Sequence, residues 1–547
     1  MGLLATAVLT QRATRPLLGV RSAPPWLLAT ALALAWLAFA PPTPDLAAQV
    51  YRAGLFDREG FTLFNANWYG GHHTPAYSIL FPPLGALLGV RVVGVLAAVA
   101  SAVLFERIAR RHFGERARWG ALLFAAGTAA DLLIGRLTFA VGVTLALAAV
   151  FALQRGHHRS GLALALGCTL ASPVAGLFLA LAGGAHWLAS RRRIGLWVAA
   201  AAFAPAAALA VLFPEGGSQP YSAGTLVSIL LACALLLWVL PRDERLLRSG
   251  TLLYLGAALL AFAIATPMGA NASRLGVAFA GPLLLCTALA TGDPRRRSGV
   301  LVATIVLLGW QWWAPVRETI KGAVDPSGQA AYYAPLLRFV DTRAEAAVRV
   351  EVPFTRLHWE SVHVARDLPL ARGWVTQLDV KYNPLFRIQA AARLSPERYR
   401  QWLRREGVRY VALPDVALDP TGRAEGALIR RGLPFLRPVH RSRHWAIYEV
   451  LGTPGLADGV GRLTRIGPQS FELDVPRPGF TLVRVRFTPY WSIARGHGCV
   501  MRSAAGWTLV FAVRDGPLKV ATQFDPRRLV TQDARCRQAP RGSQGPL

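Results

Sequence analysis

Long apolar runs recur through the first 315 residues of this 547-residue chain, and short arginine-rich segments separate them. A helix that crosses a bilayer needs about 20 mostly apolar residues, so these runs predict a multi-pass membrane domain. The fifth run is short and ends near Pro173, which leaves open a half-helix or a broken hairpin with the sixth. We expect eleven spans, over residues 24–42, 89–106, 118–134, 137–153, 160–172, 174–190, 194–213, 223–240, 250–267, 275–291 and 298–315.

The composition agrees with a membrane protein. Hydrophobic residues make up 53% of the chain and charged residues 16%, whereas about a quarter of a soluble domain is charged. These values exclude a soluble cytosolic enzyme and a disordered chain. The net charge of +30 does not indicate a nucleic-acid partner, because the cations are spread over inner loops and the C-terminal half and form no recognition motif.

The positions of the arginines predict the orientation, because cytoplasmic loops collect arginine and lysine. We place residues 1–23 in the cytoplasm. The arginines of the first 315 residues then fall on inner segments or at their boundaries, except Arg52, Arg58, Arg91, Arg136 and Arg274. Since eleven is odd, the C-terminal half is expected outside the cytoplasm. The predicted location is the plasma membrane, in contact with membrane lipids.

The C-terminal half reads as an extracytoplasmic domain of two parts. Residues 326–455 mix strand and helix patterns, including a helix at 395–407 with Ser395 as its N-cap, and predict an α/β subdomain. Residues 456–535 alternate apolar and polar side chains between turn residues, as in a β-sandwich. Residues 536–547 are polar and rich in proline and glycine, and we expect a disordered tail.

The cysteines follow the same division. Three of the five lie in predicted spans and read as small apolar residues. Cys499 and Cys536 are the remaining two, and both fall in the domain expected on the oxidising side. The sequence therefore predicts a disulfide between Cys499 and Cys536, with two separate thiols as the alternative.

The first outer loop, residues 43–88, is much longer than the other connections of the membrane domain. A loop of this length is usually functional or forms structure of its own. Asp45 follows the first span closely, where partial loss of hydration would raise its pKa and suit it to general-base chemistry. Asp45 also stands where a helix over the following residues would begin, and the two interpretations are compatible.

Two acids and four ring or amide side chains further along this loop are candidates for substrate binding. Asp57 and Glu59 flank Arg58 and are predicted to bind a sugar hydroxyl pair or a metal, or else to form a solvated turn. Aromatic and amide side chains together suit a sugar ring. The adjacent histidines diverge on an extended chain and favour a hydrogen-bonding role over chelation. These four residues are Asn67, Trp68, His72 and His73.

Two arginines near the outer boundary of the membrane domain are candidates for phosphate binding. Arg136 follows Asp131 across the tight turn between the third and fourth spans, where the two would form either a salt bridge or part of a cavity. Arg274 is the one cation of the segment before the tenth span. Its planar guanidinium matches a phosphate, and snorkelling to lipid head groups is the alternative.

The segment from the first span through Asp45 and the long aromatic loop to the sequence PPLG resembles the GT-C superfamily of glycosyltransferases. The resemblance covers residues 24–315 by architecture. It implies transfer of a sugar from a polyprenyl-phosphate donor to an extracytoplasmic glycan, lipid or protein. In that reading Asp45 is the base, and Arg274 with Arg136 neutralises the departing phosphate. Asp45 is followed by Leu46, so Asp45 acts alone, Asp57 takes the second acidic position, or the site is degenerate.

Other functions remain open at this point. A transporter or flippase of cell-envelope precursors would carry charges at mid-membrane depth, and a non-catalytic scaffold would need no shared cavity. The distinguishing feature is whether Asp45, Arg136 and Arg274 converge. The sequence identifies no certain cofactor, and participation of a divalent metal stays open.

Overall fold

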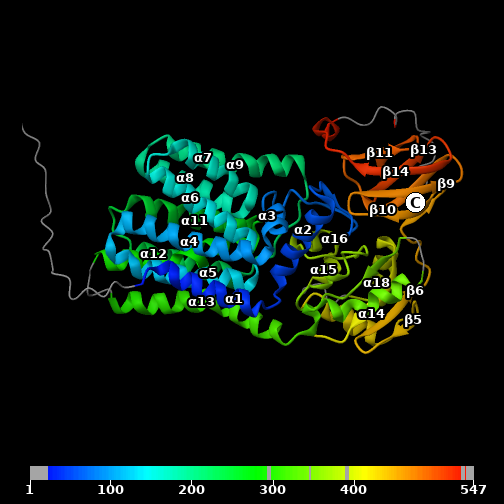
Figure 1. Cartoon of the computed structure of the whole chain (residues 1–547), viewed down its shortest axis with the longest axis horizontal. Helices are drawn as coiled ribbons and strands as arrows, with labels where there is room; N and C mark the ends of the chain where they lie inside the picture. The colour runs from blue at the N-terminus through cyan, green and yellow to red at the C-terminus, as the bar shows by residue number, and fades with distance from the viewer. Residues whose placement is uncertain (1–22, 292–296, 344–346, 388–393, 531–535, 537–547) are drawn as a thin grey trace, which may run out of the picture.

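The computed structural model describes residues 23–291, 297–343, 347–387, 394–530 and 536. Apart from Ala23 and Cys536, the predicted N-terminal segment 1–23 and tail 536–547 lie outside these residues. A bundle of helices forms one end of the molecule, and a strand-rich domain forms the other (Figure 1). The predicted fold class, a helical multi-pass membrane domain with an α/β and β-sandwich domain, is confirmed.

A helix stands at each predicted span. Small residues let neighbours approach: a Cβ atom on Gly183 would lie 2.7 Å from the backbone nitrogen of Ala199 on the next helix. The helices of the bundle are α1 (Pro25–Phe39), α4 (Val90–Phe113), α5 (Arg118–Ile134), α6 (Leu137–Gln154), α7 (His158–Ala171), α8 (Pro173–Ser190), α9 (Ile194–Leu212), α10 (Ala223–Val239), α11 (Arg245–Ala263), α12 (Ser273–Thr291) and α13 (Arg297–Ala323).

The first loop has structure of its own. It forms α2 (Pro44–Glu59), a short hairpin of β1 (Phe64–Asn65) and β2 (His72–His73), and α3 (Phe81–Leu88). Helices α1 and α2 meet at an angle of 77°. The chain therefore turns sharply after α1, and α2 lies between the bundle and the C-terminal domain (Figure 1).

Among the described residues, eight helices are long and apolar enough to cross a membrane, or nine if α1 and α2 are taken as one bent span. Helix α10 is apolar but has 17 residues. Helix α7 has 14 residues, about 21 Å by helix geometry, which is short of a typical hydrocarbon core of about 30 Å.

Helix α7 nevertheless runs from one side of the bundle to the other. It begins directly after the turn that carries Arg155, and Arg159 lies in its first turn. At its other end the carbonyl oxygen of Leu170 accepts hydrogen bonds from the backbone of the first loop at Ile79 and Leu80, at 2.9 and 3.1 Å. These contacts favour a short complete span over a half-helix.

The C-terminal domain packs on the first loop. The side chain of Asn67 donates to the carbonyl oxygen of Ala365 at 2.8 Å, and the indole of Trp68 donates to that of Ser361 at 3.0 Å. Loop and domain thus lie on the same side of the bundle, which requires an even number of crossings between them. Helices α4 to α13 supply an even number when α7 is included. Which side faces the cytoplasm stays a prediction.

The first part of the C-terminal domain is a four-stranded sheet with helices around it, in the strand order β3-β4-β6-β5. Strands β3 and β4 are parallel, and β6 is antiparallel to both of its neighbours. The elements are α14 (Ala330–Asp341), β3 (Arg349–Glu351), α15 (Glu360–His363), α16 (Thr376–Tyr382), α18 (Pro396–Glu406), β4 (Val408–Pro414), α19 (Arg423–Arg430), β5 (Leu436–Arg441) and β6 (Trp445–Val450).

The structure confirms the N-cap that the sequence predicted for helix α18. The hydroxyl of Ser395 accepts a hydrogen bond from the backbone N–H of Arg398 at 3.3 Å, as an N-cap does. Pro396 occupies the first turn, and Gly407 ends the helix with a φ of 65°.

The second part consists of two four-stranded antiparallel sheets. One has the order β12-β13-β10-β7 and the other β11-β14-β9-β8. Both sheets bury alternate apolar residues in a shared core, which confirms the predicted sandwich. The strands are β7 (Ala457–Gly459), β8 (Arg462–Ile466), β9 (Ser470–Val475), β10 (Gly479–Arg486), β11 (Trp491–Arg495), β12 (Gly498–Arg502), β13 (Trp507–Ala512) and β14 (Gly516–Thr522).

Cys499 lies in β12, and Cys536 follows the last strand of the sandwich in the chain. They are nevertheless neighbours: the Sγ atom of Cys536 lies 3.5 Å from the carbonyl oxygen of Val500, the residue after Cys499. The disulfide between Cys499 and Cys536 therefore stays a prediction.

Candidate active site

Asp45 lies in the first turn of α2. Pro44 occupies the first helical position, and a carboxylate there is stabilised by the positive end of the helix dipole. The N-cap residue is Thr43, so Asp45 does not cap its own helix. Its side chain is 34% exposed and remains available for contacts with other elements.

Arg136 meets Asp45 from the turn between α5 and α6. Its Nε atom lies 3.4 Å from the Oδ2 atom of Asp45. The turn approaches α2 closely because residue 135 is glycine: its φ is 85°, and a Cβ atom there would lie 2.3 Å from the backbone nitrogen of Leu46. One of the two interpretations from sequence was a salt bridge between Asp131 and Arg136. In the structure Arg136 forms its short-range ion pair with Asp45.

Arg274 joins the same cluster from the first turn of α12. It interacts electrostatically with Arg136, Asp45 and Asp131, and its guanidinium lies 5.5 Å from the ring centre of Phe139. Asp45, Arg136 and Arg274 therefore converge, although they lie far apart in the sequence. With Asp131 the cluster has two carboxylates and two guanidinium groups, and its formal charges balance.

Asp131 also lines a small pocket of the bundle, among helices α4, α5, α6, α12 and α13. Its polar lining includes Ser101, Thr128 and Gln311. Polar and ionisable side chains within a membrane domain usually mark a functional cavity. The charged cluster and this pocket therefore share Asp131.

Helix α2 carries two further polar residues on the face of Asp45, and sequence analysis did not single them out. Gln49 and Arg52 follow Asp45 at four and seven residues, which places all three on one helical face. The amide of Gln49 donates to the hydroxyl of Tyr77 at 3.0 Å, and the Arg52 guanidinium lies 3.6 Å from the ring centre of Tyr77. This spacing of polar residues in a mostly apolar helix was the available signal.

Trp68 does not offer a face to a sugar, which corrects the expectation from sequence. Its side chain is fully buried. Tyr51 stacks near it at 4.3 Å between ring centres, and His72 at 5.6 Å with nearly parallel planes. Asn67 is likewise buried and bonded to Ala365. Both side chains anchor the loop to the C-terminal domain, because the domain covers the part of the loop that carries them.

The two histidines are buried as well and hold the loop rather than face a substrate. Burial lowers the pKa of His72 to about 4, so its ring is neutral at pH 7. The Nδ1 atom of His73 lies 2.6 Å from a carboxylate oxygen of Glu215, and its Nε2 atom lies 2.9 Å from the hydroxyl of Thr488. His73 thus joins the first loop, the α9–α10 connection and the sandwich.

Asp57 and Glu59 lie apart from the charged cluster. Both are exposed in the last turns of α2, and Asp57 is about 18 Å from Asp45 along the helix axis by helix geometry. Asp57 therefore does not act as a second carboxylate beside Asp45. Within the described part of the chain, no group of three histidine, cysteine or acidic residues has the arrangement of a metal site.

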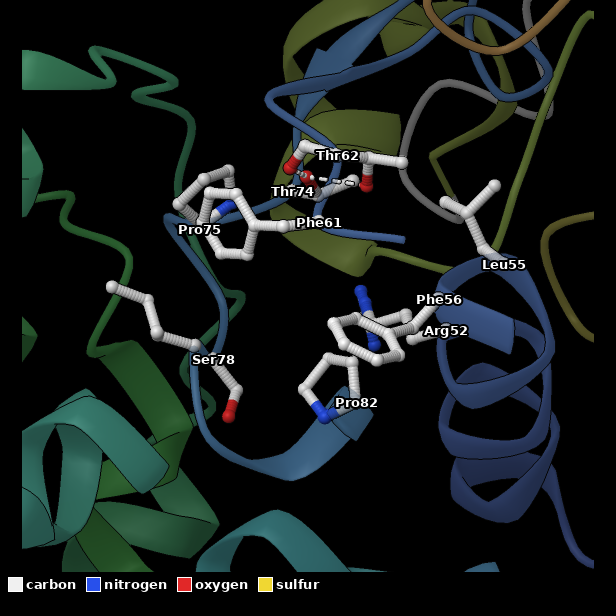
Figure 2. A pocket seen from close by; sticks show the side chains of 10 residues that line it. Arg52, Leu55, Phe56, Phe61, Thr62, Thr74, Pro75, Ser78 and Pro82 are labelled. Atoms are coloured by element: carbon white, nitrogen blue, oxygen red, sulfur yellow. Dashed lines mark hydrogen bonds between the residues drawn. The ribbon is translucent and has the colours of Figure 1, made fainter. Parts of the chain in front are cut away.

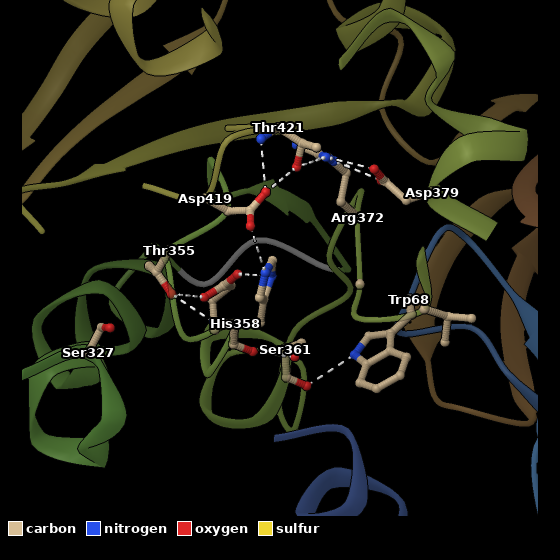
Figure 3. Close-up of polar contacts among 12 residues, drawn as sticks. Trp68, Ser327, Thr355, His358, Ser361, Arg372, Asp379, Asp419 and Thr421 are labelled. Carbon is tan, nitrogen blue, oxygen red and sulfur yellow. Dashed lines mark hydrogen bonds and ion pairs between the residues drawn. The ribbon is translucent and has the colours of Figure 1, made fainter. Parts of the chain in front are cut away.

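A buried network of polar side chains holds the segment of the C-terminal domain to which the Trp68 indole is hydrogen-bonded (Figure 3). The ring of His358 stacks on Trp374 at 3.5 Å, and its Nε2 atom lies 3.5 Å from a carboxylate oxygen of Asp419. Its Nδ1 atom lies 3.7 Å from Glu360, whose pKa burial raises to about 7. The network holds residues 358–361, whose last carbonyl accepts the Trp68 indole.

The protein was compared with known families, curated proteins and solved structures. No protein-family model matches the sequence, and no curated protein matches it. Its structure is similar to that of a mycobacterial arabinofuranosyltransferase. That cryo-electron-microscopy structure, of the arabinofuranosyltransferase AftD, is 15% identical over 91% of this chain, with a TM-score of 0.44. This chain spans 60% of the length of that structure. At this identity and TM-score, no family and no function are drawn from the likeness.

Proposed function

We propose that the protein is an integral membrane glycosyltransferase. It transfers a sugar from a polyprenyl-phosphate donor to a glycan, lipid or protein acceptor outside the cytoplasm. The observation that carries the proposal is the convergence of Asp45, Arg136 and Arg274 from three separate elements at the loop end of the bundle. A carboxylate beside two guanidinium groups supplies both a base and positive charge for a departing phosphate.

The reaction is a displacement with inversion at the anomeric carbon. The Asp45 carboxylate takes the proton of an acceptor hydroxyl, and the acceptor oxygen forms a bond to that carbon. The bond between the carbon and the phosphate oxygen breaks, and the lipid phosphate leaves with the electron pair. Arg136 orients the Asp45 carboxylate through the ion pair between them. Arg274 adds positive charge to the same space.

The arrangement favours an enzyme over the two other functions. A scaffold has no requirement for a carboxylate and two arginines from distant parts of the chain to meet. A transporter would bind its substrate at mid-membrane depth, whereas Asp45 and Arg136 lie at helix ends on the side of the first loop.

The proposal is tested by sugar transfer in liposomes that contain the purified full-length protein. Polyprenyl-phosphate sugars of several kinds are offered as donors with cell-envelope glycans as acceptors. We expect a radiolabelled sugar to appear on the acceptor, with release of polyprenyl phosphate. Movement of the intact lipid across the bilayer without transfer would contradict the proposal and favour the flippase function.

A further inference from the structure

A short segment with exposed apolar side chains leaves the sandwich at the end of β14. It covers residues 524–530 and contains one 3-10 turn, η6 (Pro526–Leu529). Phe524 is 49% exposed and Val530 is 87% exposed. Figure 1 shows the segment, in red, at the end of the sandwich that lies nearest the helix bundle. Exposed apolar side chains that are grouped indicate an interaction surface more often than single ones do.

Segment 524–530 packs on the last turn of α9. The ring centre of Phe524 lies 6.1 Å from that of Phe213, the residue that ends α9, and 5.4 Å from that of Tyr490. The hydroxyl of Tyr490 donates to the carbonyl oxygen of Leu212 at 2.7 Å. Leu529 packs against the same apolar cluster. These contacts set the height of the segment relative to a helix that is long and apolar enough to cross the membrane.

The first loop forms the other side of this junction. Three apolar residues of the loop belong to the same cluster as the end of α9: Leu63, Ala76 and Ile79. Figure 2 shows the adjoining part of the loop, where Phe61 and Pro75 line one small pocket. The two stretches of the loop are joined there, because the hydroxyl oxygens of Thr62 and Thr74 lie 3.1 Å apart. Segment 524–530 would therefore separate from α9 only if this packed junction were broken.

The outward surface of α9 is apolar up to the same level. Trp197 is 62% exposed, Phe203 55% and Val211 69%. Side chains of this kind on a membrane-spanning helix contact lipid, because the surrounding hydrocarbon is as apolar as they are. Val211 lies two residues before Phe213, so the lipid-facing surface of α9 reaches the helix end on which Phe524 packs. The boundary of the bilayer and segment 524–530 therefore lie at the same level.

Two arginines stand among the apolar residues of the segment. Arg527 is exposed. Arg528 is partly exposed, with its Nε atom 3.7 Å from a carboxylate oxygen of Asp525, and its Nη1 atom donates to the carbonyl oxygen of Trp491 at 2.9 Å. Apolar side chains next to arginines are typical of segments that lie on a bilayer, where the apolar groups enter the lipid and the guanidinium groups meet the lipid phosphates. This pattern matches a phospholipid surface.

We propose that segment 524–530 anchors the sandwich to the bilayer leaflet on the side of the first loop. Phe524 and Val530 enter the boundary between the hydrocarbon and the head groups, and Arg527 contacts the phosphates of phospholipids. The lipid and the packed junction then hold the sandwich at two places. The inference rests on the helical membrane domain and its contact with the sandwich, and it depends neither on sugar transfer nor on which side of the membrane faces the cytoplasm.

The experiment measures the surroundings of a nitroxide spin label on the full-length protein in phosphatidylcholine liposomes. The label is attached to Val530→Cys in a background with Cys499→Ala and Cys536→Ala. The three cysteines of the bundle are buried, and the same background without Val530→Cys corrects for any label on them. Molecular oxygen concentrates in lipid and a neutral nickel chelate stays in water. We expect the label at residue 530 to collide with oxygen severalfold more often than with the chelate.

Val513→Cys is the matched control on the same domain. Val513 is 54% exposed and precedes β14, whereas segment 524–530 follows it. The seven residues of β14 span about 20 Å by strand geometry, so the control site lies at the far end of the strand. We expect the chelate to dominate the collisions of a label at residue 513.

Three results would overturn the proposal. Equal access of the chelate to residues 530 and 513 would show that the segment faces water. Exclusion of both oxygen and the chelate from residue 530 would show that protein covers it, as in a contact with a second copy of the chain. Phe524→Ser should raise the chelate collision rate at residue 530 severalfold, because the larger apolar group of the anchor is lost, and an unchanged rate would contradict insertion of Phe524.

The lipid composition tests the arginine. Addition of anionic phosphatidylglycerol to the liposomes should lower the chelate collision rate at residue 530, because basic residues near a membrane are attracted to anionic lipids. Arg527→Gln should remove most of this difference, and a difference of wild-type size in Arg527→Gln would contradict the role of Arg527. Asp45→Asn should leave the label at residue 530 in lipid, so failure of the proposed sugar transfer and failure of the anchor are separate outcomes.

Discussion

Asp45 and Arg136 form an ion pair between the start of α2 and the start of α6, with 3.4 Å between the Oδ2 and Nε atoms. Both side chains are partly exposed, at 34% and 28%, so the pair adds little to the free energy of unfolding. Its main consequence is orientation of a charged carboxylate. Substitution of either residue therefore tests chemistry more than folding.

Asp45→Asn should lower the rate of sugar transfer by roughly 10² or more, which is the usual effect of removing a general base. The amide keeps the size of the side chain but cannot accept the proton. The measurement is turnover at saturating donor in liposomes. Asp57→Asn on the same helix is the control and should keep wild-type activity. Full activity of Asp45→Asn would remove Asp45 as the base.

Arg274→Lys should reduce both donor affinity and turnover. Lysine keeps the positive charge but loses the planar fork of guanidinium donors, so the field remains while the directed hydrogen bonds are lost. We expect an increase in KM together with a decrease in kcat. Arg58→Lys serves as the control because Arg58 is exposed. A normal KM and kcat in Arg274→Lys would leave Arg274 as a lipid-facing residue.

The orientation of the chain is testable with reporters. A reporter fused after Leu547 should be active only if it functions outside the cytoplasm, because the distribution of arginines places the first loop and the C-terminal domain there. A cytoplasmic reporter inserted in the α6–α7 turn at Gly156 should be active. Activity of a cytoplasmic reporter after Leu547 would contradict the predicted topology.

Cys499 and Cys536 should be linked in protein isolated from an oxidising compartment. The Cys536 thiol lies 3.5 Å from the carbonyl oxygen of Val500, the residue after Cys499. Labelling of denatured, unreduced protein should modify three of the five cysteines, and Cys536→Ser should raise this number to four. Modification of all five wild-type cysteines would show that the bond is absent.

The C-terminal domain should lose stability as the pH rises from 4.5 toward 7. Burial raises the pKa of Glu360 from 4.5 to about 7, so in this range the unfolded chain releases a proton that the folded chain retains. The contribution to the free energy of unfolding is full below pH 4.5 and falls by up to about 3 kcal/mol as the pH passes 7.

Glu360→Gln should remove this contribution, because the amide stays neutral at every pH. We expect the melting temperature of the variant to change less between pH 4.5 and 7.5 than that of the wild type, followed by tryptophan fluorescence of the full-length protein. Glu472→Gln, at a partly exposed ion pair, should behave as the wild type. Equal pH dependence of Glu360→Gln and the wild type would contradict the prediction.

The sequence by itself determined the elements of the fold. Apolar runs of bilayer length become helices because a chain in lipid must satisfy its backbone hydrogen bonds internally. Alternation of apolar and polar residues over 456–535 predicted the sandwich for an equally local reason, since successive side chains of a strand point to opposite faces. Asp45 was identifiable because its position after the first span is a property of the chain alone.

The tertiary structure decided which side chains meet and which are covered. Residues 45, 136 and 274 converge only because the turn at Gly135 packs against α2 and α12 begins beside it. The sequence predicted that Trp68 binds a sugar ring. The C-terminal domain, which lies hundreds of residues later in the chain, covers this side chain. Arg52 reads as one more arginine, and its burial follows from the packing of the loop on α2. Local pattern specifies helices and strands, whereas burial and charge balance depend on contacts between distant segments.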